Sequence, residues 1–132
     1  MSFTFINPAS LGAPRGYSNG VLTEGGRLLF IAGQIAWNEQ QQIVSEDLVA
    51  QFDRALANVI SVVTEAGGTP DQIARLILYV TDKKDYQRRM KEIGERYRVH
   101  MGKHFPAMVL VEVKSLLDDR AMIEIEGLAV LS

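Results

Sequence analysis

The sequence contains no cysteine. This absence excludes disulfides, thiolate metal sites and a cysteine nucleophile. Long apolar runs are missing as well, because no segment approaches the ~18 apolar residues of a membrane span. The first eight residues, Met1 to Pro8, have neither the basic nor the apolar region of an export signal. We therefore expect a cytoplasmic protein that does not bind membranes.

Positive charge is not in excess. The chain has 14 Lys and Arg residues against 16 Asp and Glu residues, and its net charge is −2. Such a balance provides no overall positive field for a phosphate backbone, so nucleic acid is an unlikely partner. The basic side chains between Lys83 and Arg98 alternate with acidic ones, which is typical of a solvated helix face with local ion pairs.

Common signatures of cofactor and nucleophile chemistry are also absent. The sequence has no Gly-rich phosphate loop, no Ser-His-Asp order and no dinucleotide fingerprint. His100 and His104 are four residues apart, but Gly102 should end the helix between them and no third ligand is evident, so no metal site is predicted. No repeat or linker divides the 132 residues, and we expect one domain over residues 1–132.

Hydrophobic periodicity predicts the elements of that domain. Residues 17–22 and 28–32 should form a hairpin around Glu24-Gly25-Gly26, and a helix should begin after an N-cap at Ser45 and end at Gly67-Gly68. A buried strand over 74–80 and an amphipathic helix over 82–101 follow. Two strands, 104–113 and 121–130, complete the chain.

This order indicates an α/β (α+β) fold, in which one mixed sheet has two helices packed on one face. The strand over 104–113 is apolar on both sides, so two helices cannot cover the whole sheet. Oligomerisation through the uncovered face is the simplest expectation.

The last strand carries two carboxylates on one face. Glu124 and Glu126 alternate with Ile123, Ile125 and Gly127, which places them on the same side and roughly 6.5–7 Å apart. Glu112, Glu124 or Glu126 could act as a general base if partly desolvated. Each could equally be a solvated strand residue or a salt-bridge partner.

Two further positions have a functional and a structural interpretation. Gly33 would allow a ligand or another backbone to approach closely, or would mark a simple bulge. Tyr17 could orient a ligand through its phenol or complete the core. The residue pattern alone leaves both alternatives open.

Several short motifs, taken together, resemble the reactive-intermediate deaminase family, which is also called the Rid or YjgF-like family. They are Gly16-Tyr17-Ser18, Ala32-Gly33-Gln34-Ile35, Asn58, Phe105-Pro106-Ala107, Val111-Glu112-Val113 and Ile123-Glu124-Ile125-Glu126. The resemblance follows nearly the whole chain in order. It implies a chorismate-mutase-like fold and a homotrimer with small-metabolite clefts between subunits. It also implies cofactor-independent hydrolysis of enamines and imines. The alternative is a ligand-binding or interaction protein without catalysis, which is favoured where the sequence lacks the family's carboxylate-binding arginine.

The resemblance also assigns roles and shows where this sequence departs from the family. Glu124 matches the acidic residue that positions the attacking water, and Tyr17, the Gly33 backbone and Ala107 are expected ligand contacts. Met108 stands where archetypal members have a carboxylate-binding arginine, and Leu110 stands where they often have cysteine. Methionine cannot replace a charge-assisted hydrogen bond, and its thioether suits an apolar ligand. Arg15 or Arg120 could supply another cation.

Overall fold

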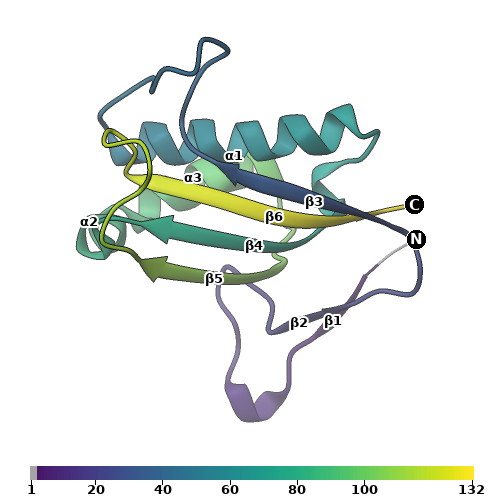
Figure 1. Cartoon of the computed structure of the whole chain (residues 1–132). Coiled ribbons are helices and arrows are strands. Elements are labelled where there is room, and N and C mark those ends of the chain that lie inside the picture. The colour runs from purple at the N-terminus through teal and green to yellow at the C-terminus, as the bar shows by residue number, and fades with distance from the viewer. Residues whose placement is uncertain (1–2) are drawn as a thin grey trace.

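A four-stranded mixed sheet carries two long helices on one of its faces (Figure 1). The computed structural model describes residues 3–132. The strand order is β3-β6-β4-β5, in which β4 and β5 are parallel and the other neighbours are antiparallel. The elements are β1 (Thr4–Ile6), β2 (Gly20–Leu22), β3 (Arg27–Gln34), α1 (Leu48–Glu65), β4 (Ile73–Val80), α2 (Lys83–Arg88), α3 (Met90–Met101), β5 (Ala107–Glu112) and β6 (Ile123–Leu131). The predicted α+β class with a mixed sheet is confirmed.

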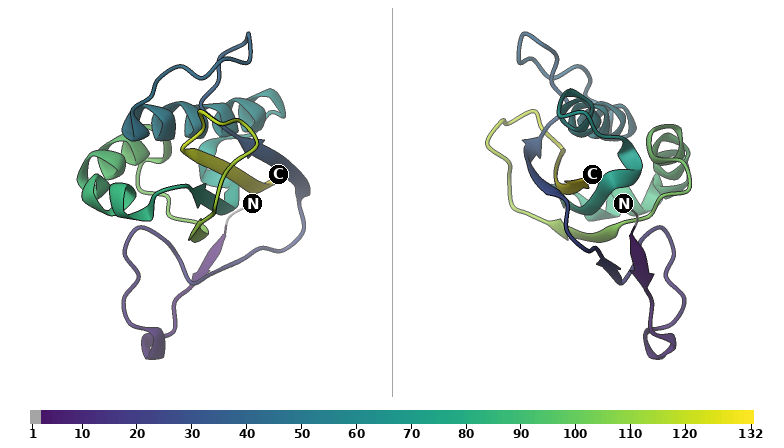
Figure 2. Two further views of the ribbon diagram at one scale, coloured as in Figure 1. Left: turned by 60° about the vertical axis from the view of Figure 1, so that its left-hand side comes forward. Right: turned by 90° about the vertical axis from the view of Figure 1, so that its right-hand side faces the viewer.

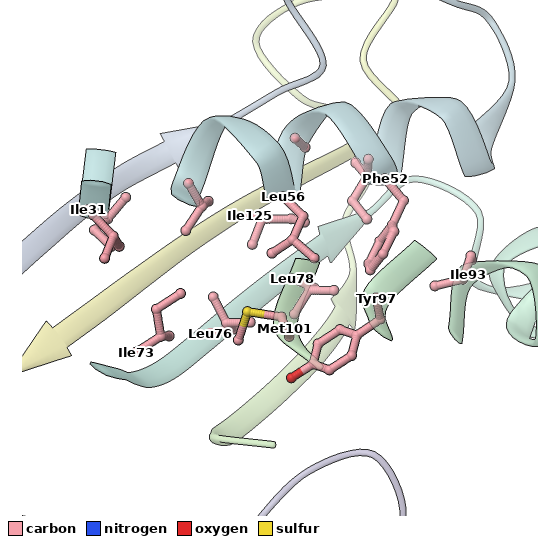
Figure 3. Packing of buried hydrophobic residues seen from close by; sticks show 14 of the residues in the cluster. Ile31, Phe52, Leu56, Ile73, Leu76, Leu78, Ile93, Tyr97, Met101 and Ile125 are labelled. Atoms are coloured by element: carbon pink, nitrogen blue, oxygen red, sulfur yellow. The ribbon is translucent and has the colours of Figure 1, made fainter. Parts of the chain in front are cut away.

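One hydrophobic cluster fills the space between the sheet and the helices. Phe52 and Leu56 reach down from α1, Ile125 rises from β6, and Tyr97 packs from α3 (Figure 3). All four are buried, and full burial of an aliphatic or aromatic side chain of this size contributes about 1.5–3 kcal/mol. The two further views show α1 and α3 on the same side of the sheet (Figure 2). The opposite face receives no helix from within residues 3–132.

Helix α1 begins two residues later than the sequence predicted. Asp47 is the N-cap, and its carboxylate accepts a hydrogen bond from the Ala50 amide at 3.0 Å. Ser45 instead accepts from the Asp47 amide at 3.0 Å, so it shapes the approach to the helix. The helix ends before Gly67, whose φ of 87° favours glycine.

The single helix predicted over 82–101 is wrong, because the chain forms two helices that meet at Arg89. Arg89 has φ −106° and ψ 15°, outside the helical range. Its guanidinium bonds Asp47 at 3.0 Å and Glu92 at 2.9 Å, so it links the start of α1 to the start of α3. The apolar residues keep their helical spacing across Arg89. The hydrophobic pattern over residues 82–101 therefore does not indicate that the helix is interrupted there.

The predicted hairpin between residues 17–22 and 28–32 is also wrong. Gly25 and Gly26 do have positive φ, but β2 pairs with β1 and β3 pairs with β6. The nine-residue β6 gives β3 a long antiparallel partner, whereas β1 and β2 form a separate two-stranded arm. The stacked ring pair of Phe3 and His104 holds that arm against the domain.

An ionic cluster joins α1 to α3. The Asp53 carboxylate lies 2.8 Å from Arg96 Nε and 2.7 Å from His100 Nε2. Partial burial alone would raise the pKa of Asp53, but the hydrogen bonds from Arg96 and His100 outweigh it and lower the pKa below its ordinary 3.8. Since the folded state favours the charged carboxylate, the stabilisation is present above about pH 3.8 and is lost as the pH falls through the lower folded value.

We expect Asp53→Asn to lower the free energy of unfolding by about 1 kcal/mol at pH 7, because the variant loses the negative charge that Arg96 and His100 contact in a half-buried setting. The difference from the parent should shrink as the pH falls below 3.8. Urea titrations of the parent and the variant, at pH 7 and at a pH below 3.8, measure the difference in the free energy of unfolding. Asp119→Asn, on an exposed loop, is the matched control. An equal loss at both pH values would show that the charge of Asp53 is not the source.

Candidate functional site

The face of the sheet opposite the helices is apolar with a few polar groups. Phe30 on β3 is 73% exposed and Val109 on β5 is 48% exposed. Between them, Glu124 and Glu126 project from β6 while Ile123 and Ile125 are buried on the helix side. The predicted alternation along the last strand is therefore confirmed. We call this surface, with Phe30, Val109, Glu124 and Glu126, the open face.

The three carboxylates considered as a general base have different surroundings. Glu112 accepts a hydrogen bond from the Lys83 amide at 3.0 Å, at the start of α2. Glu126 accepts a hydrogen bond from the Tyr79 hydroxyl, and this bond raises the pKa of Tyr79. Within residues 3–132 the Glu124 carboxylate has no hydrogen-bond or ion-pair partner. Glu124 is thus the one of the three whose oxygens are free to bind a ligand or a water.

Gly33 determines where the Glu124 carboxylate can lie. The β3–β6 register shifts between Ile31 and Gln34, which marks an irregularity at Gly33. A Cβ on Gly33 would overlap Glu124 Oε2 and lie 2.8 Å from Glu124 Cδ. The carboxylate therefore occupies the space that any other residue at position 33 would fill. Gly33 thus lies at an irregularity of an edge strand and leaves room for the Glu124 carboxylate, while its predicted contact with a ligand stays a prediction.

A groove lies on the helix side of β5. Its volume is about 510 Å³, and Met108 and Leu110 form part of its wall together with Tyr17. The other lining residues come from α1, α2, α3, β4, β6 and the segments before β2 and β5: Arg15, Gly16, Phe52, Leu56, Leu76, Leu78, Tyr86, Gln87, Met90, Ile93, Gly94, Tyr97, Arg98, Phe105, Val109 and Ile125. We call it the α3–β5 groove.

Tyr17 reaches the groove because its neighbour is tied to the start of β5. The Ser18 amide donates to the Pro106 carbonyl at 2.9 Å, and the Ser18 hydroxyl donates to the Phe105 carbonyl at 2.6 Å. Ser18 also forms a parallel bridge with Ala107. These bonds hold residues 16–18 beside the groove, although they lie outside β2.

Two tyrosines of the groove, the half-buried Tyr86 and the buried Tyr97, remain uncharged. Burial raises the pKa of Tyr86 to about 12 and also raises the pKa of Tyr97, whose hydroxyl donates to the His104 carbonyl at 2.7 Å. Both phenols are therefore protonated at neutral pH. Together with Met90 and Ile93 they give the groove a mainly apolar surface.

The structure divides the predicted site residues between two faces. Tyr17, Met108 and Leu110 line the α3–β5 groove, whereas Gly33 and Glu124 meet on the open face. Ala107 follows the alternation of β5 and shares the side of Val109. One chain by itself therefore does not bring Glu124 to Met108.

The candidate cations and histidines are also separated. Arg15 lines the α3–β5 groove, but Arg120 lines a different depression beside Glu46 and Asp118. Arg98 lines the groove as well, a position that sequence reasoning missed because the residue belongs to a run of mixed charges. His100 contacts Asp53, while His104 Nε2 lies 2.6 Å from the Ile73 carbonyl oxygen. Over the described range 3–132, no three His, Cys, Asp or Glu side chains group into a possible metal site.

Comparisons with known proteins match this architecture. A family model described as Ribonuc_L-PSP, Endoribonuclease L-PSP, matches residues 8–131. The 2-iminobutanoate/2-iminopropanoate deaminase of Escherichia coli K12 is 32% identical over 126 residues, which are 93% of this chain and 91% of that protein. The crystal structure of YyfB, a Rid-family protein of unknown function from Yersinia pestis, is 34% identical with a TM-score of 0.89 and covers 99% of this chain and 100% of its own. That of Escherichia coli TdcF with bound serine is 29% identical with a TM-score of 0.70 and covers 92% of each chain.

A mixed sheet with helices on one face is thus the architecture of solved Rid proteins, and this chain shares it. The chain belongs to the Ribonuc_L-PSP family, the family of YjgF-like, RutC and Rid proteins. The resemblance inferred from the short motifs is confirmed. Among residues 3–132, the structure has no helix with the length and apolar character needed to cross a membrane.

Proposed function

We propose that this protein forms a homotrimer whose intersubunit clefts bind a small metabolite and hydrolyse its imine or enamine form. The observation that carries the proposal is the free Glu124 carboxylate seated on Gly33. Relatives that are 32% identical, from Escherichia coli and Salmonella typhimurium, are named 2-iminobutanoate/2-iminopropanoate deaminases. Their names support imines as the substrate class.

Two features support a site shared between copies. Gly33 lies on β3 and Met108 on β5, which are the opposite edges of the sheet. Glu124 and Met108 also project from opposite faces. If copies lie side by side in a closed ring, the β3 edge of one can meet the β5 edge of the next. If the open faces also turn toward the centre of the ring, the exposed Phe30 and Val109 are covered, which removes an apolar surface that is costly in water.

In the proposed reaction Glu124 binds a water molecule and accepts its proton as the oxygen attacks the imine carbon. The C=N electron pair moves to nitrogen, which is protonated. Collapse of the tetrahedral carbinolamine then forms the C=O bond and breaks the C–N bond. The balance is imine plus water giving a carbonyl compound plus ammonia, without a cofactor. A positioned acid–base group of this kind contributes about 10²–10⁴-fold to the rate.

Met108 supports a second candidate function, which is ligand binding without turnover. At this position the side chain carries no charge, so it cannot bind a carboxylate as an arginine would. Loss of that contact removes an interaction worth about 1.5–3 kcal/mol. A cleft that has kept its shape but lost this contact would still bind a ligand.

The structure gives less support to RNA as a ligand, although the family model carries the name of an endoribonuclease. Three of the arginines between residues 83 and 101 are paired with carboxylates: Arg88 with Asp85, Arg89 with Asp47 and Glu92, and Arg96 with Asp53. Paired arginines release few counterions on binding a phosphate backbone. The basic side chains between Lys83 and Arg98 are therefore better explained as part of a solvated helix face.

The test is the decay of imines generated in situ by an amino-acid oxidase across a panel of amino acids. We expect the parent protein to accelerate release of the 2-oxo acid over buffer alone. Met108→Arg should improve turnover of the smallest imino acids by about 10- to 100-fold, because it adds a charge-assisted hydrogen bond to the carboxylate. Turnover by Met108→Arg alone would contradict the hydrolytic function of the parent and select binding without catalysis.

A further inference from the structure

The α3–β5 groove contains two arginines and no opposing charge. Arg15 and Arg98 both line it, and none of its lining residues within 3–132 is acidic. A site of one sign attracts ligands of the other sign, because its field is not cancelled nearby. The charge of the groove therefore favours an anion.

Arg98 differs from the other arginines between residues 83 and 101. Arg88, Arg89 and Arg96 each have a carboxylate partner, whereas Arg98 has no ion pair in the part of the chain that the structure describes. Its Nη1 lies 3.4 Å from the position that a Cβ on Gly94 would take, and Gly94 lines the groove. The absent side chain at Gly94 thus leaves room for the guanidinium over the groove. Arg15 is likewise exposed and without an ion pair over residues 3–132.

Away from the arginines the groove is mainly apolar, although Gln87 also lines it. Met90 is 57% exposed, and Tyr86, Ile93, Met108 and Leu110 continue the apolar wall. A volume of about 510 Å³ lies within the usual range of about 300–1,000 Å³ for small-molecule sites. It also exceeds what a three-carbon acid would fill. A ligand that matches this surface has a bulky apolar group and one anionic end.

We propose that the α3–β5 groove recognises carboxylic acids with an aromatic or branched apolar side chain, and that Arg15 and Arg98 bind the carboxylate. The apolar side chain lies against Met108 and Leu110. This inference rests on the proposed function, since it names the acid whose imine the cleft would receive. Arg15 and Arg98 would supply the positive charge that Met108 cannot provide. Of the two arginines considered from the sequence, Arg15 lines the groove, whereas Arg120 lies in another depression.

The proposal is tested by calorimetric titration with phenylpyruvate, with pyruvate and with 1-phenylpropan-2-one, a ketone that lacks the carboxylate. The parent protein should bind phenylpyruvate at least tenfold more tightly than either of the other two. Arg15→Gln and Arg98→Gln should each weaken phenylpyruvate binding by about tenfold and leave the ketone unaffected, since each removes hydrogen bonds to a charged group. Arg120→Gln is the matched control and should bind like the parent.

A second variant tests the apolar part of the groove. Leu110→Ala removes apolar surface from the groove wall and leaves both arginines in place, so it should weaken phenylpyruvate more than pyruvate. Unchanged affinity in both arginine variants, or equal affinity of the parent for the acid and the ketone, would overturn the proposal. Imine hydrolysis by the same samples is measured separately. If the parent binds phenylpyruvate through the two arginines but hydrolyses no imine, the proposed reaction is contradicted and the proposed ligand class is supported.

Discussion

Glu124→Gln is expected to lower the rate of imine hydrolysis by at least about 100-fold, because the amide cannot accept the proton of the attacking water. The substitution preserves the size of the side chain, so the cleft should still bind ligand. Initial rates of 2-oxo acid formation, followed beside calorimetric affinities for phenylpyruvate, separate the two effects. A fall in rate without a matching fall in affinity is the expected result.

Two further substitutions define the role of this carboxylate. Gly33→Ala leaves Glu124 in the sequence but places a Cβ where its carboxylate lies, so turnover should fall nearly as far as in Glu124→Gln. Glu126→Gln is the matched control: its carboxylate is engaged by Tyr79, and the variant should turn over like the parent. If Glu124→Gln hydrolyses imines at the parent rate, Glu124 does not activate the attacking water.

Phe30→Glu is expected to convert the assembly into single chains. Phe30 is 73% exposed in the single chain, so its replacement should change the stability of that chain little. Within an interface, however, a buried carboxylate without a partner costs several kcal/mol at each copy. Sedimentation velocity at micromolar concentration measures the change in mass from three chains to one.

The control for this experiment is Val99→Glu. Val99 is another exposed apolar side chain, at 64%, but it lies on α3 and away from the open face. It should leave the sedimentation coefficient at the parent value. A parent protein that sediments as a single chain would contradict the proposed trimer, and an unchanged Phe30→Glu assembly would place the interface elsewhere.

The parts of the fold that local pattern determines were predictable. The alternation of Glu124 and Glu126 with Ile123 and Ile125 fixed the two faces of β6, and the apolar period of α1 fixed its buried stripe. Both signals follow from geometry repeated within one element. The family assignment also followed from short motifs in their order along the chain.

The parts that depend on distant contacts were not predictable. The pairing of β3 with β6 rather than β2 is decided by residues about a hundred positions away, although the turn glycines between β2 and β3 are real. The break at Arg89 depends on Asp47, and the place of Arg98 at the groove depends on how α3 lies across the groove from β5. No local pattern encodes these relations.

The central place of β6 has a consequence for how the chain is made. This strand lies between β3 and β4, so neither can join the other in one sheet until β6 is available. Before β6 is synthesised, β1 can pair with β2 and β4 with β5, but β3 has no partner in the four-stranded sheet. Helix α1 can form in that interval, but the core closes only when the final strand is inserted. Formation of the complete sheet should accordingly be a concerted event that depends on contacts between residues distant in sequence.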